Sequence, residues 1–140
     1  MESNEVSFGQ YGKSFQEKIM QALLTDPKWA EQMMEVFTTS YFDLKYLQYL
    51  SDRYFQYAKK YKDFPSLQML VTIIKDELKQ PGSDAALRDQ IVDYLQRVKA
   101  NPSPQDLPFV KDKSLDFCKK QALRTAMIKA VDLVATDKYE

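Results

Sequence analysis

The chain has 140 residues, of which 44% are apolar and 29% are charged, and its 20 basic residues balance 20 acidic ones. This size and composition are typical of a single globular domain, and the zero net charge argues against a stand-alone nucleic-acid binder, because such affinity comes mostly from phosphate neutralisation. The absence of histidine and the single cysteine, Cys118, exclude a structural zinc site and an internal disulfide.

Several further features of the composition favour a soluble, all-α protein. The three glycines are few, and Leu, Lys, Gln, Glu and Met are good helix formers. The first residues, MESNEVSFGQYG, lack the apolar segment of a signal peptide, and no apolar run is long enough to cross a membrane. We therefore expect a cytoplasmic protein with no membrane contact.

The first third of the chain predicts a disordered lead over residues 1–12 and then two short helices. Ser14 and Glu17 have the spacing of a capping box, so a helix is expected to begin there. Asp26-Pro27 is expected to end it and to begin the next, because Asp caps a helix and Pro fits the first helical position. The predicted apolar faces are Ile19, Ala22, Leu23 and Leu24 in the first helix and Trp29, Met33, Val36 and Phe37 in the second.

Two further helices complete a predicted helical head over residues 13–80. Apolar residues at helical spacing predict a long third helix over 43–62 and a fourth over 67–79. Phe64-Pro65-Ser66 separates them and supplies the cap of the fourth. Their stripes are Leu47, Leu50, Tyr54, Tyr57 and Tyr61 in the third helix, and Leu67, Leu70, Ile74 and Leu78 in the fourth.

Residues 81–140 predict a helical hairpin of the same domain. Pro81-Gly82 is a strong break, and it is followed by predicted helices over 84–99 and 111–137, which we expect to pair antiparallel. A lone pair of helices covers only one face of each, so the head or another subunit is expected to complete the packing. The stripes are Leu87, Ile91, Leu95 and Val98, then Leu115, Cys118, Ala122, Leu123, Ala126, Met127, Ala130, Val131 and Val134.

Motifs that carry chemistry are scarce. Gly12-Lys13-Ser14 matches the end of a P-loop, but Ser7 stands where the first glycine is required and no strand precedes it, so a helix start is the better interpretation. Cys118 lies on an apolar stripe and is interpreted as a core residue. We predict no catalytic, cofactor-binding or metal-binding residue in this chain.

Two groups of residues have both a binding interpretation and a structural one. The tyrosines clustered between Tyr41 and Tyr61, beside lysines, could stack on single-stranded bases, but filling a core or a subunit contact is favoured. Lys113, Lys120 and Arg124 share one face of the last predicted helix and could contact DNA or an acidic partner, although a solvated face explains them as well.

The order of these signals resembles the N-terminal domain of the DnaB family of replicative hexameric helicases, and most closely the T4-type phage helicases. The resemblance covers most of residues 14–137, although bacterial members often have glycine at the position of Gln21 and a longer turn before Trp29. The matching residues are Glu17, Ile19, Met20, Ala22, Leu23, Leu24, Thr25 and Asp26, then Tyr41-Phe42-Asp43, and finally Phe64-Pro65-Ser66.

The resemblance implies a non-catalytic collar domain that associates with itself in a dimer or hexameric ring. Such a collar recruits a primase or helicase loader and surrounds single-stranded DNA, while a C-terminal RecA-like motor, absent from these residues, would bind ATP and Mg and unwind the duplex in the host cytoplasm. These residues themselves would need no cofactor. The expected interface residues are Ile91, Leu95, Leu123, Met127, Tyr54 and Tyr57.

Two alternatives stay open from the sequence. The chain could be an independent helical adaptor, such as a helicase loader or another phage protein-interaction module. It could also be a small enzyme, which would require a pocket with convergent polar groups that the sequence does not indicate.

Overall fold

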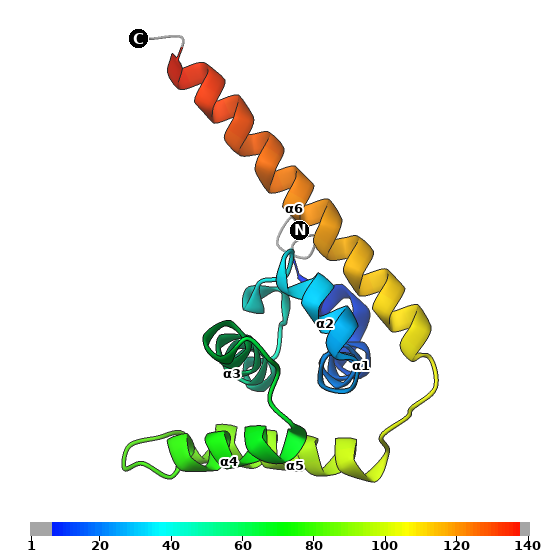
Figure 1. The fold of residues 1–140 in the computed structure, drawn as a ribbon, viewed down its shortest axis with the longest axis vertical. Helices are drawn as coiled ribbons and strands as arrows, with labels where there is room; N and C mark the ends of the chain where they lie inside the picture. The colour runs from blue at the N-terminus through cyan, green and yellow to red at the C-terminus, as the bar shows by residue number, and fades with distance from the viewer. Residues whose placement is uncertain (1–6, 138–140) are drawn as a thin grey trace.

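The computed structural model describes residues 7–137, and the helices in this part of the chain confirm the predicted all-α class, with no strand among the described residues. Helices α1, α2 and α3 form a central body, the α4–α5 pair lies on one side of it, and the long α6 lies on the other (Figure 1). The bounds are α1 Gly12–Thr25, α2 Pro27–Met34, α3 Lys45–Tyr61, α4 Leu67–Leu78, α5 Ala85–Ala100 and α6 Leu107–Asp137, with short 3-10 helices η2 Phe8–Tyr11 and η3 Thr39–Tyr41.

Three helices begin at side-chain caps, of which those of α2 and α4 were predicted from the sequence. The side chains of Asp26, Ser66 and Asp84 each accept a hydrogen bond from the backbone N–H three residues later, at 3.2, 3.1 and 3.0 Å. These bonds satisfy an N–H group that has no partner inside the helix. At the other end of α3, Lys62 adopts the left-handed conformation with φ of 62° and ends the helix.

The predicted capping box at the start of α1 is wrong. The helix begins two residues earlier than Ser14, and its N-cap residue, Tyr11, makes no side-chain capping bond. Gly12 has φ of 85°, a conformation that favours glycine, and it joins η2 directly to α1. Glu17 does not reach back to the helix start, because Arg97 and Tyr46 hold its carboxylate.

The prediction that residues 1–12 are disordered is also wrong for residues 7–12. Residues 1–6 lie outside the described residues, but η2 is an ordered 3-10 helix whose Phe8 has no exposed surface. The Phe8 ring packs against Phe42 at a centroid distance of 5.5 Å and against Phe117 at 5.0 Å. Burial of an aromatic side chain supplies the free energy that orders this short segment.

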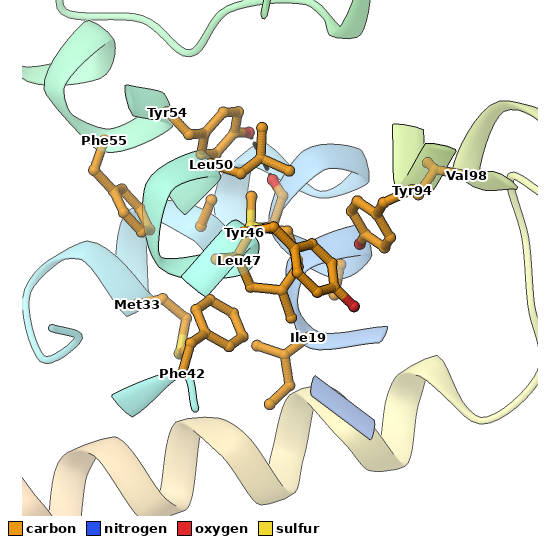
Figure 2. Packing of buried hydrophobic residues seen from close by; sticks show 14 of the residues in the cluster. Ile19, Met33, Phe42, Tyr46, Leu47, Leu50, Tyr54, Phe55, Tyr94 and Val98 are labelled. Carbon is orange, nitrogen blue, oxygen red and sulfur yellow. Dashed lines mark hydrogen bonds between the residues drawn. The ribbon is translucent and has the colours of Figure 1, made fainter. Parts of the chain in front are cut away.

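One continuous apolar core joins the helices (Figure 2). Ile19 of α1, Leu47 and Leu50 of α3, and Phe42 before α3 have no exposed surface, and Tyr94 of α5 is 2% exposed. Most of the predicted stripe residues of α1 to α5 are therefore core residues. The exceptions in α3 are Tyr57, which is half-buried, and Tyr61, which is 56% exposed.

The predicted antiparallel pairing of the last two helices is wrong. Helix α5 packs against α4 and α3, so the hairpin in this fold is α4–α5, whereas α6 packs against α1 and α2 (Figure 1). Helix α6 also begins at Leu107 and not at 111, because Pro108 falls in its first turn, where a missing N–H is tolerated. The head therefore contains α5, and α6 alone extends from it.

Candidate interaction surface on the C-terminal helix

The first half of α6 is anchored to the body by ion pairs and by aromatic packing. The Lys111 ammonium lies 2.8 Å from Oδ2 of Asp26, the residue that caps α2, and Lys18 of α1 lies 3.5 Å from Asp106 just before α6. Near the end of this anchored half, the Phe117 ring packs against Phe8, as described above. These contacts fix the direction in which the rest of the helix leaves the body.

The second half of α6 lies on the surface of the described structure. Every residue from 123 to 136 is exposed, and the helix projects away from the body (Figure 1). Leu123 is 62% exposed, Met127 60%, Val131 67% and Val134 68%. Scattered single apolar residues are normal on a protein surface, but a contiguous set of this kind marks an interaction site.

The apolar face changes sides along α6. At about 100° per residue, the buried positions Val110, Ser114, Phe117 and Cys118 lie on one side of the helix. The exposed positions 123, 127, 130 and 134 lie about 150° further round the helix axis. The second half therefore does not extend the contact that anchors the first half, and it presents an apolar stripe of its own.

The exposed stripe has the spacing of a helix–helix contact. Leu123, Met127, Ala130 and Val134 follow one another at intervals of four, three and four residues, which keeps them along one seam. Ala130 is small, so a partner helix can approach closely there. Three further exposed apolar residues lie off this seam: Val131 and Leu133 on its two sides, and Ile128, 55% exposed, on the opposite side of the helix.

The structure separates the six residues predicted for an interface into three groups. Ile91 and Tyr54 are at most 1% exposed and belong to the core of the head, so they offer no surface to another subunit, and Leu95 is 4% exposed at the edge of a hollow between α4 and α5. Leu123 and Met127 are exposed on the stripe of α6. Tyr57 is half-buried on α3, with its ring 4.6 Å from that of Tyr61.

The three basic residues predicted to contact DNA or a partner lie on the exposed surface of α6. Lys113, Lys120 and Arg124 share a face that borders the apolar stripe. Lys120 forms an exposed ion pair of 3.0 Å with Asp116 one turn earlier. This face is solvated in the described structure and can flank a contact made by the stripe.

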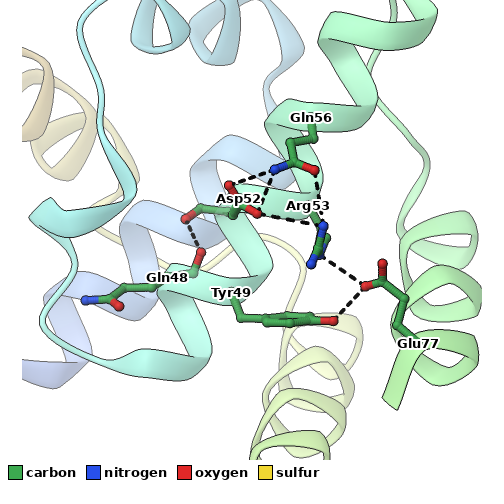
Figure 3. A network of polar contacts seen from close by, with 7 residues as sticks. Gln48, Tyr49, Asp52, Arg53, Gln56 and Glu77 are labelled. Carbon is green, nitrogen blue, oxygen red and sulfur yellow. Dashed lines mark hydrogen bonds and ion pairs between the residues drawn. The ribbon is translucent and has the colours of Figure 1, made fainter. Parts of the chain in front are cut away.

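The clustered tyrosines are mostly structural. The hydroxyl of Tyr54 donates to the carbonyl oxygen of Leu23 at 2.6 Å. Tyr49 donates to Glu77 of α4 at 2.6 Å, and Arg53 pairs with the same carboxylate at 3.1 Å, which ties α3 to α4 (Figure 3). Tyr54 is buried in the core and Tyr49 links two helices, so these two tyrosines stabilise the packing of the head.

A polar cluster around Glu17 joins α1 to α5 and α3. Arg97 contacts both carboxylate oxygens of Glu17, at 2.8 and 2.9 Å, and the Tyr46 hydroxyl donates to the same carboxylate. Burial raises the pKa of Glu17, but the hydrogen bonds from Arg97 and Tyr46 lower it by more, so its pKa lies below the ordinary value. A carboxylate held in its charged form by two donors stabilises the helix contact and is a poor proton donor or acceptor near neutral pH.

Other forms of chemistry find no site among the described residues. No group of three or more acidic or cysteine side chains is placed to hold a metal ion in this part of the chain. Burial raises the pKa of the Cys118 thiol to about 12, which leaves it protonated and unreactive at neutral pH. None of the helices in the described range has the length and apolar character that spanning a membrane requires.

Sequence reasoning identified the residues of the stripe but not its geometry. It assigned Leu115 through Val134 to one continuous face, although the buried and the exposed positions of α6 are out of phase. The signal was present in the spacing, because Val110, Ser114 and Phe117 fall on the opposite side of a helix from Leu123.

Comparison of the chain with protein-family models, with curated protein sequences and with solved structures found no match.

Proposed function

We propose that this chain is a protein-assembly module in which the exposed half of α6 pairs with the same helix of a second copy. The observation that carries this proposal is the apolar stripe from Leu123 to Val134 on a helix that leaves an otherwise closed core. An isolated helical segment of this length is only marginally stable in water. Burial of Leu, Met and Val side chains contributes roughly 1.5–3 kcal/mol each, so a helical partner stabilises the segment.

A second copy is the occupant that fits the stripe best. The stripe is self-complementary in character, because large residues at 123, 127 and 134 alternate with alanines at 126 and 130. Two such helices can place the large side chains of one beside the small ones of the other, as in closely packed helical pairs. A two-fold contact of this kind uses the same surface on both chains.

At a finer level, we propose that the module is the N-terminal collar domain of a phage-type replicative DNA helicase. The support is the resemblance of residues 14–137 to that domain, together with the all-helical fold and an exposed surface suited to assembly. The collar would hold the subunits of the ring together and dock a primase or loader in the host cytoplasm. Unwinding and ATP hydrolysis, with Mg, would belong to a motor outside these 140 residues.

The assembly proposal is tested by measuring mass with light scattering across a range of protein concentrations. The Leu123→Glu/Met127→Glu variant places two carboxylates on the stripe and should reduce the assembly to single chains. The matched control, Thr125→Glu/Ile128→Glu, adds the same charges to the polar side of the same helix and should retain the mass of the natural protein. A natural protein that is monomeric throughout, or a control that dissociates equally, would contradict the proposal.

Leu95→Asp is not a useful test of the interface, because Leu95 is 4% exposed and a charge there would disrupt the core of the head. The helicase assignment has a separate test in the complete open reading frame. A P-loop that follows a strand downstream of these residues supports it. A reading frame that ends without such a motor contradicts it and favours the independent adaptor.

A further inference from the structure

A shallow apolar groove runs along the α4–α5 hairpin, at the opposite end of the molecule from the exposed half of α6 (Figure 1). It forms a hollow of about 510 Å³ whose floor is Leu67 and Val71 of α4 with Val92 and Leu95 of α5. A second hollow of about 470 Å³ continues it along the hairpin and shares Val92. Together they make an elongated surface between two antiparallel helices, which is apolar at the first hollow and charged around Val92 at the second.

The rim of this groove is basic. Lys75 and Lys99 line the first hollow, no carboxylate lines it, and neither lysine forms an ion pair with a described residue. The second hollow adds Lys79 and Arg88 beside two aspartates. Those carboxylates already face guanidinium groups, at 3.5 Å for Asp89 and 3.1 Å for Asp93, so the rim retains a net positive charge.

We propose that the α4–α5 groove binds an acidic amphipathic helix of a partner protein. The apolar floor between two helices accepts a row of apolar side chains at helical spacing, which is the helix-in-groove mode of recognition. The lysines on the rim match acidic residues that flank such a row, and this charge complementarity sets the orientation and the rate of association. The proposal specifies the partner-docking role within the proposed function and rests on it.

The same features disfavour other occupants. Nucleic-acid binding draws its affinity from many phosphate contacts, whereas this surface offers three lysines without an ion pair to a described residue, Lys75, Lys79 and Lys99. A small ligand is usually enclosed and held by several convergent polar groups, and apart from the lysines only Gln68 and Gln96 supply polar atoms to the first hollow.

The test is an NMR titration of the isotope-labelled chain with a synthetic helical peptide. The probe carries leucines at positions i, i+3, i+4 and i+7 with glutamates beside them, and the control peptide has the same composition with the leucines distributed around the helix. We expect the probe to shift the signals of Val71, Val92 and their neighbours, and the control peptide to leave them unchanged. Equal shifts with both peptides would overturn the proposal.

Charge reversal supplies the second arm of the test. Lys75→Glu/Lys99→Glu should weaken peptide binding by at least about tenfold, whereas Lys28→Glu/Lys60→Glu, which makes the same change at exposed lysines outside the groove, should not. Unchanged affinity of the groove variant would overturn the proposal. So would an oligothymidine strand that shifts the same signals and displaces the peptide.

The two proposals fail in distinguishable ways. Leu123→Glu/Met127→Glu should lose self-association and retain peptide binding, while Lys75→Glu/Lys99→Glu should lose peptide binding and retain its mass. If reversing the charges of the groove lysines instead lowers the mass of the assembly, the groove is an interface between copies of this chain and the partner proposal is wrong.

Discussion

At the scale of single residues, the contacts that hold the helices together are polar side chains whose role the sequence did not reveal. Glu17 was interpreted as half of a local capping box, but its carboxylate bonds to Arg97, eighty positions away. The prediction that Glu17 lies in the first helix was correct. The partner was not predicted, because the two helices are brought together only by the tertiary fold, and spacing along the chain carries no information about such a pair.

We predict that Glu17→Gln destabilises the fold by about 1–3 kcal/mol near neutral pH, the usual range for a hydrogen bond to a charged group. The pKa of Glu17 is lower in the folded chain than its ordinary 4.5. Its contribution is therefore present above about pH 4.5 and is lost as the pH falls through the folded pKa. The difference in unfolding free energy between the natural protein and Glu17→Gln should therefore become smaller as the pH is lowered below about 4.5. Urea denaturation at several pH values measures it.

Asp89→Asn is the control for this prediction. Asp89 pairs with Arg88 at 3.5 Å, but its side chain is 76% exposed, and solvent screening limits such a pair to roughly 0.5 kcal/mol or less. A Glu17→Gln effect that is no larger than that of Asp89→Asn, or that persists undiminished in acid, would show that the buried pair does not stabilise the contact.

At the scale of the elements, the residues at which helices begin were the most predictable feature. Asp26-Pro27 and Phe64-Pro65-Ser66 mark real helix starts, because a cap is a local interaction between residues three apart. Segment η2 was missed for the opposite reason. Its polar neighbours suggest disorder, and Phe8 becomes a core residue only because α6 and the segment before α3 surround it.

We predict that Phe8→Ala destabilises the protein by about 3–5 kcal/mol, the range for removing a buried aromatic side chain. Phe8 has no exposed surface and its ring packs against four aromatic neighbours, so truncation leaves a cavity between η2 and α6. Thermal and urea unfolding measure the effect. Phe109→Ala is the matched control, because Phe109 is 62% exposed, and it should change stability by less than about 1 kcal/mol.

A small effect of Phe8→Ala, comparable with that of the control, would restore the original interpretation of this segment as a loose lead. A large effect would show that the globular fold begins at η2. The distinction matters for the anchoring of α6, because the Phe8 ring contacts Phe117 on the last buried turns of that helix.

At the scale of the whole molecule, the predicted head and hairpin differ from the structure in which helices pair. Sequence neighbours usually pack together, and that rule holds for α4 and α5 but not for α5 and α6. The information that decides the case is the phase of the apolar positions along α6. Val110 and Phe117 face the body and Leu123 faces away, so a single helix serves two surfaces.

This arrangement divides the molecule into a head with a buried core and an exposed arm, residues 123–136 of α6. The two parts should differ in their stability against local unfolding. Amide hydrogens of α1 and α3 exchange only when the head opens, because these helices contribute the buried residues of the core. Amide hydrogens between 123 and 136 are protected only to the extent that the helix there stays formed, and no buried side chain in that range holds it against the head. Protection supplied by a second copy follows mass action and falls on dilution.

We therefore predict that hydrogen exchange, followed by mass spectrometry of peptides, accelerates on dilution in residues 123–136 and stays constant in α1 and α3. Leu123→Glu/Met127→Glu should exchange rapidly in the arm at every concentration, because an unpaired helical segment frays. Thr125→Glu/Ile128→Glu should behave like the natural protein. If the arm is equally protected at all concentrations and in both variants, its helix is stable without a partner, and the exposed stripe does not hold copies of this chain together.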